Sequence, residues 1–232
     1  MKNKLRKYVL QLIRKNNPVL LNDLHSAKPI SQVFGLDRGT PIDRYYIEKF
    51  LSQNRFYIKS EVLEIADSHY SKQFALNNDV NFNVLHFTDN NKQATIVGDL
   101  TDITTLPQER IDCFICTQTY NFIYNVQDAI KGSHYLLKKN GTLLATVAGI
   151  SPISHYDMSR WGDYWRFTSA SVKELFGTVF GYDNVQVCVY GNVLAATALL
   201  RGLALEDIPD TTLLDDHDNN YQVILGVVAL KK

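Results

Sequence analysis

The chain has 232 residues, of which 45% are hydrophobic and 21% are charged, as in a folded protein with a sizeable apolar core. Its 24 Lys and Arg balance its 24 Asp and Glu, so there is no overall positive charge to attract nucleic acid. No stretch resembles a signal peptide or is long enough to cross a membrane, and we therefore expect a cytoplasmic protein.

The first 55 residues are expected to form an amino-terminal helical cap. Between residues 4 and 15, the apolar residues recur at helical spacing among basic ones, which predicts an amphipathic helix. This helix could dock on the rest of the chain, or it could contact an anionic membrane surface or a protein partner. A second helix should begin at Thr40 as N-cap, with Pro41 at its first position.

Two arginines flank this second helix start, and they suggest an anion site. Arg38 and Arg44, with the free N–H groups of the helix, could bind a phosphate or carboxylate of a substrate, and Tyr45 lies beside them. The alternative is that the two arginines pair only with Asp37 and Asp43.

The middle of the chain alternates short apolar runs with helical segments, which predicts βαβ units and a mostly parallel sheet. The central strand ends at Glu64-Ile65, in a turn that is the expected ligand position in such sheets. Further strands are expected at residues 82–87, 94–97, 111–117, 142–148, 185–190 and 221–230, and helices at 70–76, at 126–137 and after Thr168. Cys113 and Cys116 share one strand, and we expect both thiols to be buried rather than metal-bound.

The region from residue 56 to the end should form one domain, with a helical segment inserted at 191–220. The run from Val193 to Leu200 is apolar almost all round, so this helix is expected either to be buried, as a cover over the site, or to form a dimer contact.

The loop at residues 151–168 combines both tryptophans of the chain with tyrosines, arginines, aspartates and a histidine. Aromatic faces and hydrogen-bonding groups together suit a sugar, so we expect substrate contacts from the side chains of Tyr156, Arg160, Trp161, Asp163, Trp165 and Arg166. Alternatively, Trp165 and Phe167 fill the core while Arg166 pairs with Asp163. His155, oriented by Asp157, is the candidate general base. Neither this pair nor residues 215–218 has metal-ligand spacing, so no metal is expected.

The ordered segments VLEI, VGDLTD, IDCFICTQTYNFIYNV and LLKKNGTLLATV resemble those of class I S-adenosylmethionine-dependent methyltransferases of the type 11 kind. Two longer strings, FGLDRGTPIDRYYIEKFL and YDMSRWGDYWRFT, resemble methyltransferase-like proteins found among bacterial glycan-assembly genes. The resemblance extends from about Phe34 to the end of the chain.

This resemblance implies an α/β fold, a Rossmann-like three-layer sandwich whose seven-stranded, mostly parallel sheet has the order 3-2-1-4-5-7-6 and an antiparallel last strand. It implies S-adenosyl-L-methionine as cofactor, bound by Glu64, Ala66, Asp67, His86, Asp89, Asp99, Leu100, Thr117 and Gln118. Ala66 and Ser68 stand where the family has glycines, and alanine accommodates a turn with negative φ better than a left-handed one.

Two functions follow as hypotheses. The first is a methyltransferase that O-methylates a saccharide or nucleotide-linked sugar in surface-glycan biosynthesis, with a small-molecule or saccharide acceptor as its partner. The alternative is a non-catalytic methyltransferase-like module that acts as partner or scaffold for glycan-assembly enzymes. Peripheral contact with a membrane or with glycosyltransferases, and a homodimer, are further expectations.

Overall fold

The computed structural model describes residues 26–77 and 79–232, so the helix expected at residues 4–15 lies outside the described residues. One seven-stranded sheet runs through the domain in the order β3-β2-β1-β4-β5-β7-β6. Its strands are β1 (Ser60–Ile65), β2 (Val80–His86), β3 (Ile96–Val97), β4 (Ile111–Thr117), β5 (Leu137–Ala148), β6 (Val185–Tyr190) and β7 (Ile224–Leu230).

The strand directions match the prediction. The five strands β1 to β5 are parallel to one another, and β7 is antiparallel to both β5 and β6. The sheet order reverses between β1 and β4, which leaves a crevice beyond the carboxyl ends of these two strands. The predicted fold class and strand order are confirmed.

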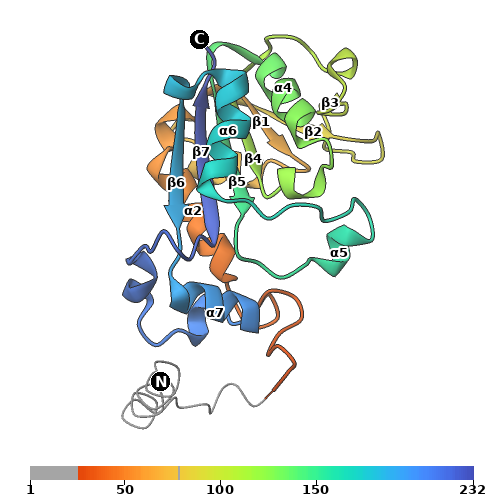
Figure 1. Cartoon of the computed structure of the whole chain (residues 1–232). Helices are drawn as coiled ribbons and strands as arrows, with labels where there is room; N and C mark the ends of the chain where they lie inside the picture. The colour runs from red at the N-terminus through yellow and green to blue at the C-terminus, as the bar shows by residue number, and fades with distance from the viewer. Residues whose placement is uncertain (1–25, 78) are drawn as a thin grey trace, which may run out of the picture.

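Helices cover both faces of the sheet and complete a three-layer sandwich (Figure 1). One face carries α4 (Val126–Leu136) and α6 (Ser169–Phe180), and the other carries α2 (Ile42–Gln53), α3 (His69–Phe74) and α7 (Val193–Arg201). A short helix, α5 (His155–Met158), lies in the loop that projects from the sheet in Figure 1.

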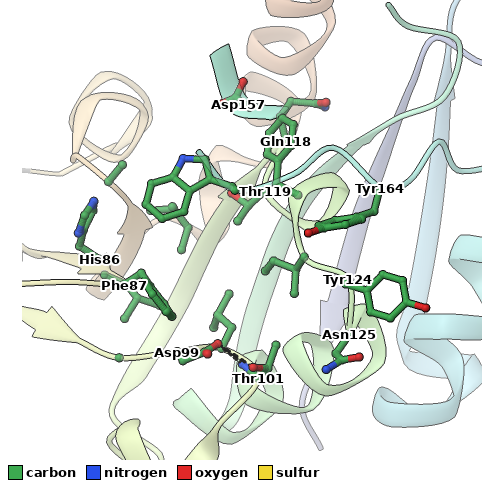
Figure 2. Close-up of a pocket in the computed structure, with 18 of the residues that line it drawn as sticks. His86, Phe87, Asp99, Thr101, Gln118, Thr119, Tyr124, Asn125, Asp157 and Tyr164 are labelled. Atoms are coloured by element: carbon green, nitrogen blue, oxygen red, sulfur yellow. Dashed lines mark hydrogen bonds between the residues drawn. The ribbon is translucent and has the colours of Figure 1, made fainter. Parts of the chain in front are cut away.

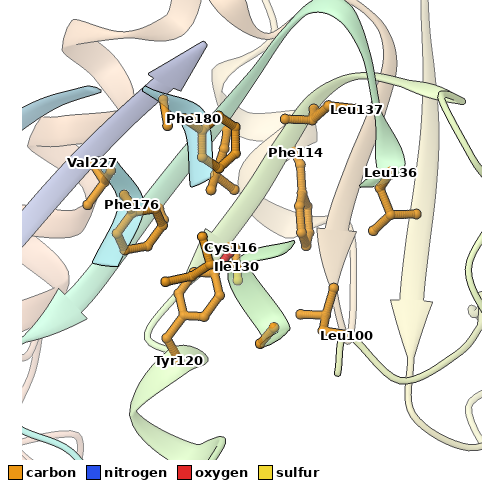
Figure 3. Close-up of a cluster of buried hydrophobic side chains, with 14 of the residues drawn as sticks. Leu100, Phe114, Cys116, Tyr120, Ile130, Leu136, Leu137, Phe176, Phe180 and Val227 are labelled. Carbon is orange, nitrogen blue, oxygen red and sulfur yellow. The ribbon is translucent and has the colours of Figure 1, made fainter. Parts of the chain in front are cut away.

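Strand β4 shows why the sheet is buried on both faces. Its side chains alternate between two apolar clusters: Phe114 and Cys116 lie in the cluster under α4 and α6, and Cys113 and Ile115 lie in the cluster on the opposite face. Figure 3 shows the first cluster, in which Phe176 of α6 meets the Tyr120 ring edge-on. Burial raises the pKa of both cysteine thiols, as expected of structural rather than reactive cysteines.

Two helix starts were predicted from capping residues, with different outcomes. Thr168 caps α6 as expected and exchanges hydrogen bonds with Ser171 in a capping box. The prediction that Thr40 caps α2 was wrong. Pro41 is the N-cap, and Thr40 instead donates both its backbone N–H and its hydroxyl to the Glu206 carboxylate, at 2.8 and 3.0 Å.

Residues 191–220 form α7 and two 3-10 turns, η5 (Leu205–Asp207) and η6 (Thr211–Asp215). Asn192 caps α7 with its side chain, and Gly202 ends it with φ of 71°. A Cβ at Gly202 would lie 2.3 Å from the Ser31 carbonyl oxygen, so this turn requires glycine. Along the described residues, none of the helices is both long and apolar enough to cross a membrane.

Candidate active site

A cavity of about 550 Å³ lies beyond the carboxyl ends of β1, β2, β3 and β4, in the crevice where the strand order reverses. Figure 2 shows that its walls come from several segments, with Asp99 and Thr101 at one end and Gln118 and Asp157 at the other. Of the predicted cofactor residues, the structure places six at the cavity and three outside its lining. The lining members are Ala66, His86, Asp99, Leu100, Thr117 and Gln118, and the others are Glu64, Asp67 and Asp89.

Asp99 follows β3 and is held by its own loop. Its Oδ1 accepts hydrogen bonds from the backbone N–H and the hydroxyl of Thr101, both at 2.8 Å. Oδ2 has no partner among the described residues, so the carboxylate keeps one acceptor for a ligand. Leu100 and Leu85 supply apolar surface beside it.

His86 is the last residue of β2 and lines the cavity. Its Nδ1 lies 2.9 Å from the Thr88 carbonyl oxygen and 3.2 Å from the Thr88 backbone nitrogen, so the Thr88 backbone holds this side of the ring. Phe87 follows it at the cavity wall. The Trp161 ring meets both side chains edge-on, with ring centroids 6.4 Å from His86 and 6.3 Å from Phe87.

The turn after β1 is built without glycine. Ala66 has φ of 67°, the left-handed conformation that alanine was expected to avoid. Two hydrogen bonds hold it there: its N–H donates to the Leu85 carbonyl at 3.0 Å, and its carbonyl accepts from Asn91 Nδ2 at 2.6 Å. Asn91 lies on a polar stretch between β2 and β3, and nothing in its spacing indicated this role.

Glu64, the acid in β1, has a structural task. Its carboxylate is buried and accepts hydrogen bonds from the backbone N–H groups of Tyr70 and Ser71, which lie in the first turn of α3. Burial raises its pKa despite these bonds. The residue therefore shapes the turn at the cavity without lining it.

The carboxyl end of β4 is tied to β5 by side-chain amides. Gln118 also adopts a left-handed backbone, with φ of 48°, and its N–H donates to the Thr146 carbonyl at 2.8 Å. Its side chain bonds both Thr146 and the buried Asn121. Asn121 was given no role from the sequence, because its second partner, the Ala148 N–H, lies in a strand distant along the chain.

The loop at residues 151–168 covers the cavity, and an ion pair fixes its shape. Arg166 binds both oxygens of Asp163, at 2.5 and 2.9 Å, and also donates to the carbonyls of Ser151 and Pro152. Burial would raise the pKa of Asp163, but bonds from Arg166 and from the Ser154 N–H hold it below its ordinary value. These two side chains are thus used within the loop, as in the alternative interpretation.

The remaining loop residues divide between the cavity and the solvent. Asp157 and Trp161 line the cavity, whereas His155 is exposed and does not. Ser154 Oγ donates to Asp157 Oδ2 at 2.6 Å. Tyr156 and Arg160 stack on each other away from the lining, with the guanidinium 3.5 Å from the ring centroid.

Aromatic rings continue from the cavity to the surface beside it. Trp165 donates its Nε1 to the carbonyls of Ile123 and Tyr124 and stacks on the Tyr124 ring. Tyr164 meets Tyr124 edge-on, with centroids 5.4 Å apart. Tyr124 and Tyr164 line the cavity, and both remain at least half exposed. We call the rings of Tyr124, Tyr164 and Trp165 the aromatic platform.

The predicted anion site at the start of α2 is separate from this cavity. Arg38 makes a two-bond ion pair with Asp207, at 2.6 and 2.7 Å, and not with Asp37. The Tyr45 hydroxyl donates to Asp215 at 2.7 Å. Neither these residues nor Arg44 line the cavity. Within residues 26–77 and 79–232, no group of three or more metal-binding side chains occurs.

Comparison with known proteins agrees with this geometry. Residues 59–145 match the family model described as a methyltransferase domain, Methyltransf_11. No curated protein sequence matches the chain. Among solved structures, a SAM dependent methyltransferase from Archaeoglobus fulgidus is 10% identical, with a TM-score of 0.53 over 81% of this chain and 94% of its own.

Two other solved structures show the same fold. The [4+2]-cyclase SpnF is 10% identical, with a TM-score of 0.53 over 89% of this chain and 87% of its own. Haemonchus contortus phosphoethanolamine N-methyltransferase 2, in complex with S-adenosyl-L-methionine, is 13% identical, with a TM-score of 0.51 over 87% of this chain and 60% of its own. The predicted resemblance to methyltransferases is confirmed: the chain has the fold of the class I S-adenosylmethionine-dependent methyltransferases, and residues 59–145 match the family model of a methyltransferase domain.

Proposed function

We propose that this protein uses S-adenosylmethionine to methylate a hydroxyl group of a saccharide or nucleotide-linked sugar in surface-glycan biosynthesis. The observation that carries the proposal is the cavity at the strand-order reversal, which has carboxylates at both ends and a roof of aromatic side chains. Cavities of roughly 300–1,000 Å³ hold molecules of cofactor size, and this one falls inside that range.

The residues of the cavity fit the cofactor. Asp99 has a free oxygen that would accept from the adenine amine, and the His86 ring, which lines the cavity, would pair with a ribose hydroxyl, a group that can both donate and accept. Leu85, Leu100 and Phe87 offer apolar surface to the base. When bound, the cofactor supplies an electrophilic methyl group on a sulfonium. The chain must supply the rest: it must hold the acceptor hydroxyl in position against the methyl group, and it must accept the proton of that hydroxyl.

Asp157 is the best-placed proton acceptor for the hydroxyl. It lines the cavity, its Oδ2 is held by Ser154, and its Oδ1 has no partner among the described residues. His155 is exposed and outside the lining, so of the two predicted catalytic residues Asp157 is the one we assign as base. A positioned base contributes about 10²- to 10⁴-fold to a rate.

The aromatic platform favours a sugar as the acceptor. Tyr124, Tyr164 and Trp165 present ring faces next to the cavity, and Trp165 is fixed by two hydrogen bonds of its indole N–H. A pyranose can stack its apolar C–H face on such rings while its hydroxyls remain available for polar contacts.

A second function is favoured by one observation. Ala66 keeps a Cβ in the turn where the cofactor would approach the backbone, and a fold alone does not establish catalysis. A non-catalytic module that binds glycan-assembly enzymes therefore remains the alternative. In either function, we propose that the basic segment at residues 4–15 provides peripheral contact with a membrane or with glycosyltransferases, and that a homodimer could form.

Methyl transfer to defined sugars tests the proposal. The purified protein would be incubated with S-adenosylmethionine labelled in the methyl group and with monosaccharides, nucleotide-linked sugars and amine controls. We expect label on a sugar, about a 10²-fold or larger loss in Asp157→Asn, and full activity in His155→Ala. Cofactor binding without transfer to any acceptor would favour the non-catalytic alternative.

A further inference from the structure

One backbone group determines the orientation of two side-chain amides at the end of β4. The Ala148 N–H lies 3.2 Å from Asn121 Oδ1, and because a backbone N–H can only donate, the Asn121 oxygen must face it. Asn121 Nδ2 therefore points the other way and donates to Gln118 Oε1, at 3.1 Å. Gln118 in turn has its NH₂ group directed to Thr146 Oγ1, at 3.3 Å.

This relay, Ala148 to Asn121 to Gln118 to Thr146, has little freedom to rearrange. Asn121 is 3% exposed and Thr146 is fully buried, so water cannot replace a hydrogen-bond partner that either side chain loses. Flipping Gln118 alone would set its NH₂ against the NH₂ of Asn121. The polarity of the Gln118 amide is thus imposed by its neighbours, and the second N–H of that NH₂ has no partner among the described residues.

The free N–H of the Gln118 amide belongs to a residue that lines the cavity. Gln118 lines the same end as Asp157, opposite the end where Asp99 and Thr101 lie (Figure 2). If adenosine occupies the Asp99 end, the amino-acid part of the cofactor falls at the Gln118 end. The described lining contains carboxylates but neither Lys nor Arg, so a bound carboxylate must be met there by neutral donors.

We propose that Asn121 is a positioning residue that sets the Gln118 amide as a hydrogen-bond donor to the amino-acid carboxylate of the cofactor. The inference rests on the proposed function, because it requires the cofactor to bind in this cavity. It adds a residue that touches no ligand yet decides whether the wall of the cavity offers a donor or an acceptor.

The isosteric variant Asn121→Asp reverses the relay. An ionised carboxylate can still accept from the Ala148 N–H, but it cannot donate to Gln118, so the Gln118 NH₂ should turn toward it. Gln118 Oε1 would then face Thr146, whose hydroxyl can donate to it. No polar group of the relay loses a partner that it has in wild type, so the variant should fold, and thermal melting followed by circular dichroism would verify this.

Two ligands that differ by one group provide the readout. S-Adenosylhomocysteine carries the amino-acid carboxylate, and S-adenosyl-3-thiopropylamine keeps the amine but lacks the carboxylate. By calorimetric titration at pH 8.5, we expect Asn121→Asp to bind S-adenosylhomocysteine about 10- to 100-fold more weakly than wild type, the usual range for a hydrogen bond to a charged group. Binding of the carboxylate-free ligand should change less than about 3-fold.

The pH dependence separates positioning from a general structural effect. The introduced carboxyl is buried, and burial raises a carboxyl pKa. Below that pKa the protonated group can donate to Gln118 again, as asparagine does, so the affinity of the variant should recover toward wild type as the pH falls. Gln118→Glu removes the donor directly and should reproduce the selective loss. Asn125→Asp, an isosteric change in the lining at the opposite end, should affect both ligands by the same factor.

Three results would overturn the proposal. Equal losses for both ligands in Asn121→Asp would mean that Asn121 only maintains the shape of the cavity. Unchanged binding of both ligands, with a folded variant at pH 8.5 and in Gln118→Glu, would mean that the Gln118 amide does not contact the cofactor. If wild type binds neither ligand, the proposed function itself fails, which is distinct from loss of selectivity in the variants alone.

Discussion

Replacing Ala66 by glycine tests whether the turn after β1 is strained. The left-handed backbone of Ala66, with φ of 67°, costs a non-glycine residue roughly 1–2 kcal/mol. Glycine loses about 0.5–1 kcal/mol more backbone entropy than alanine on folding. Since the Ala66 side chain is exposed and buries little surface, Ala66→Gly should stabilise the native state by about 0.5–1 kcal/mol.

Urea and thermal unfolding measure this effect. For a chain of this length, 1 kcal/mol corresponds to roughly 2–4 °C in Tm, so we expect a rise of about 1–4 °C. Ala75→Gly is the matched control, because Ala75 has φ of −57° and no strain to relieve. That variant should be destabilised by about 0.5–1 kcal/mol. If both variants lose the same stability, the left-handed strain at Ala66 is refuted.

Two further changes have clear expected outcomes. Asp99→Asn keeps the hydrogen bond from Thr101 but replaces the free acceptor oxygen with an NH₂ donor. Cofactor affinity should therefore fall about 10-fold or more in a calorimetric titration, with unchanged Tm. Unchanged affinity would mean that Asp99 is not part of the cofactor site. The pKa of Asp163 is lowered in the folded state, so its stabilisation is complete above the unfolded pKa of about 3.9 and is lost as the pH falls through the folded pKa. Asp163→Asn should therefore reduce the free energy of unfolding at pH 7 by about 1–3 kcal/mol. In urea unfolding at acid pH, the free energy of unfolding of the variant should also depend less steeply on pH. A pH dependence as steep as in wild type would contradict this role.

Local sequence patterns predicted most of the fold, because each pattern reflects a force that acts locally. The apolar run of β4 required burial on both faces, and Thr168, which directly precedes an apolar helical pattern, predicted the start of α6. The strand order came from the family resemblance and could not be derived from periodicity. The failed cap at Thr40 has a long-range cause, since Glu206, distant in the chain, takes the hydrogen bonds of Thr40.

The site was predicted less completely, because its decisive contacts join segments that are far apart in the chain. Asp99 and Gln118 follow strands whose carboxyl ends meet, so their presence at the cavity could be anticipated. Arg38 had nearby acids as apparent partners, yet it pairs with Asp207. Asn121 follows β4 and depends on the N–H of Ala148 at the end of β5, and no sequence motif predicts such a relay.

The central claim is that this cavity binds S-adenosylmethionine without a glycine-rich turn. Calorimetric titration of the purified protein with S-adenosylmethionine and S-adenosylhomocysteine tests it most directly. We predict micromolar or tighter binding, about −8 kcal/mol, and stabilisation by about 4 kcal/mol at millimolar ligand. No heat of binding and no thermal stabilisation at millimolar ligand would contradict the account and would direct the search to protein partners.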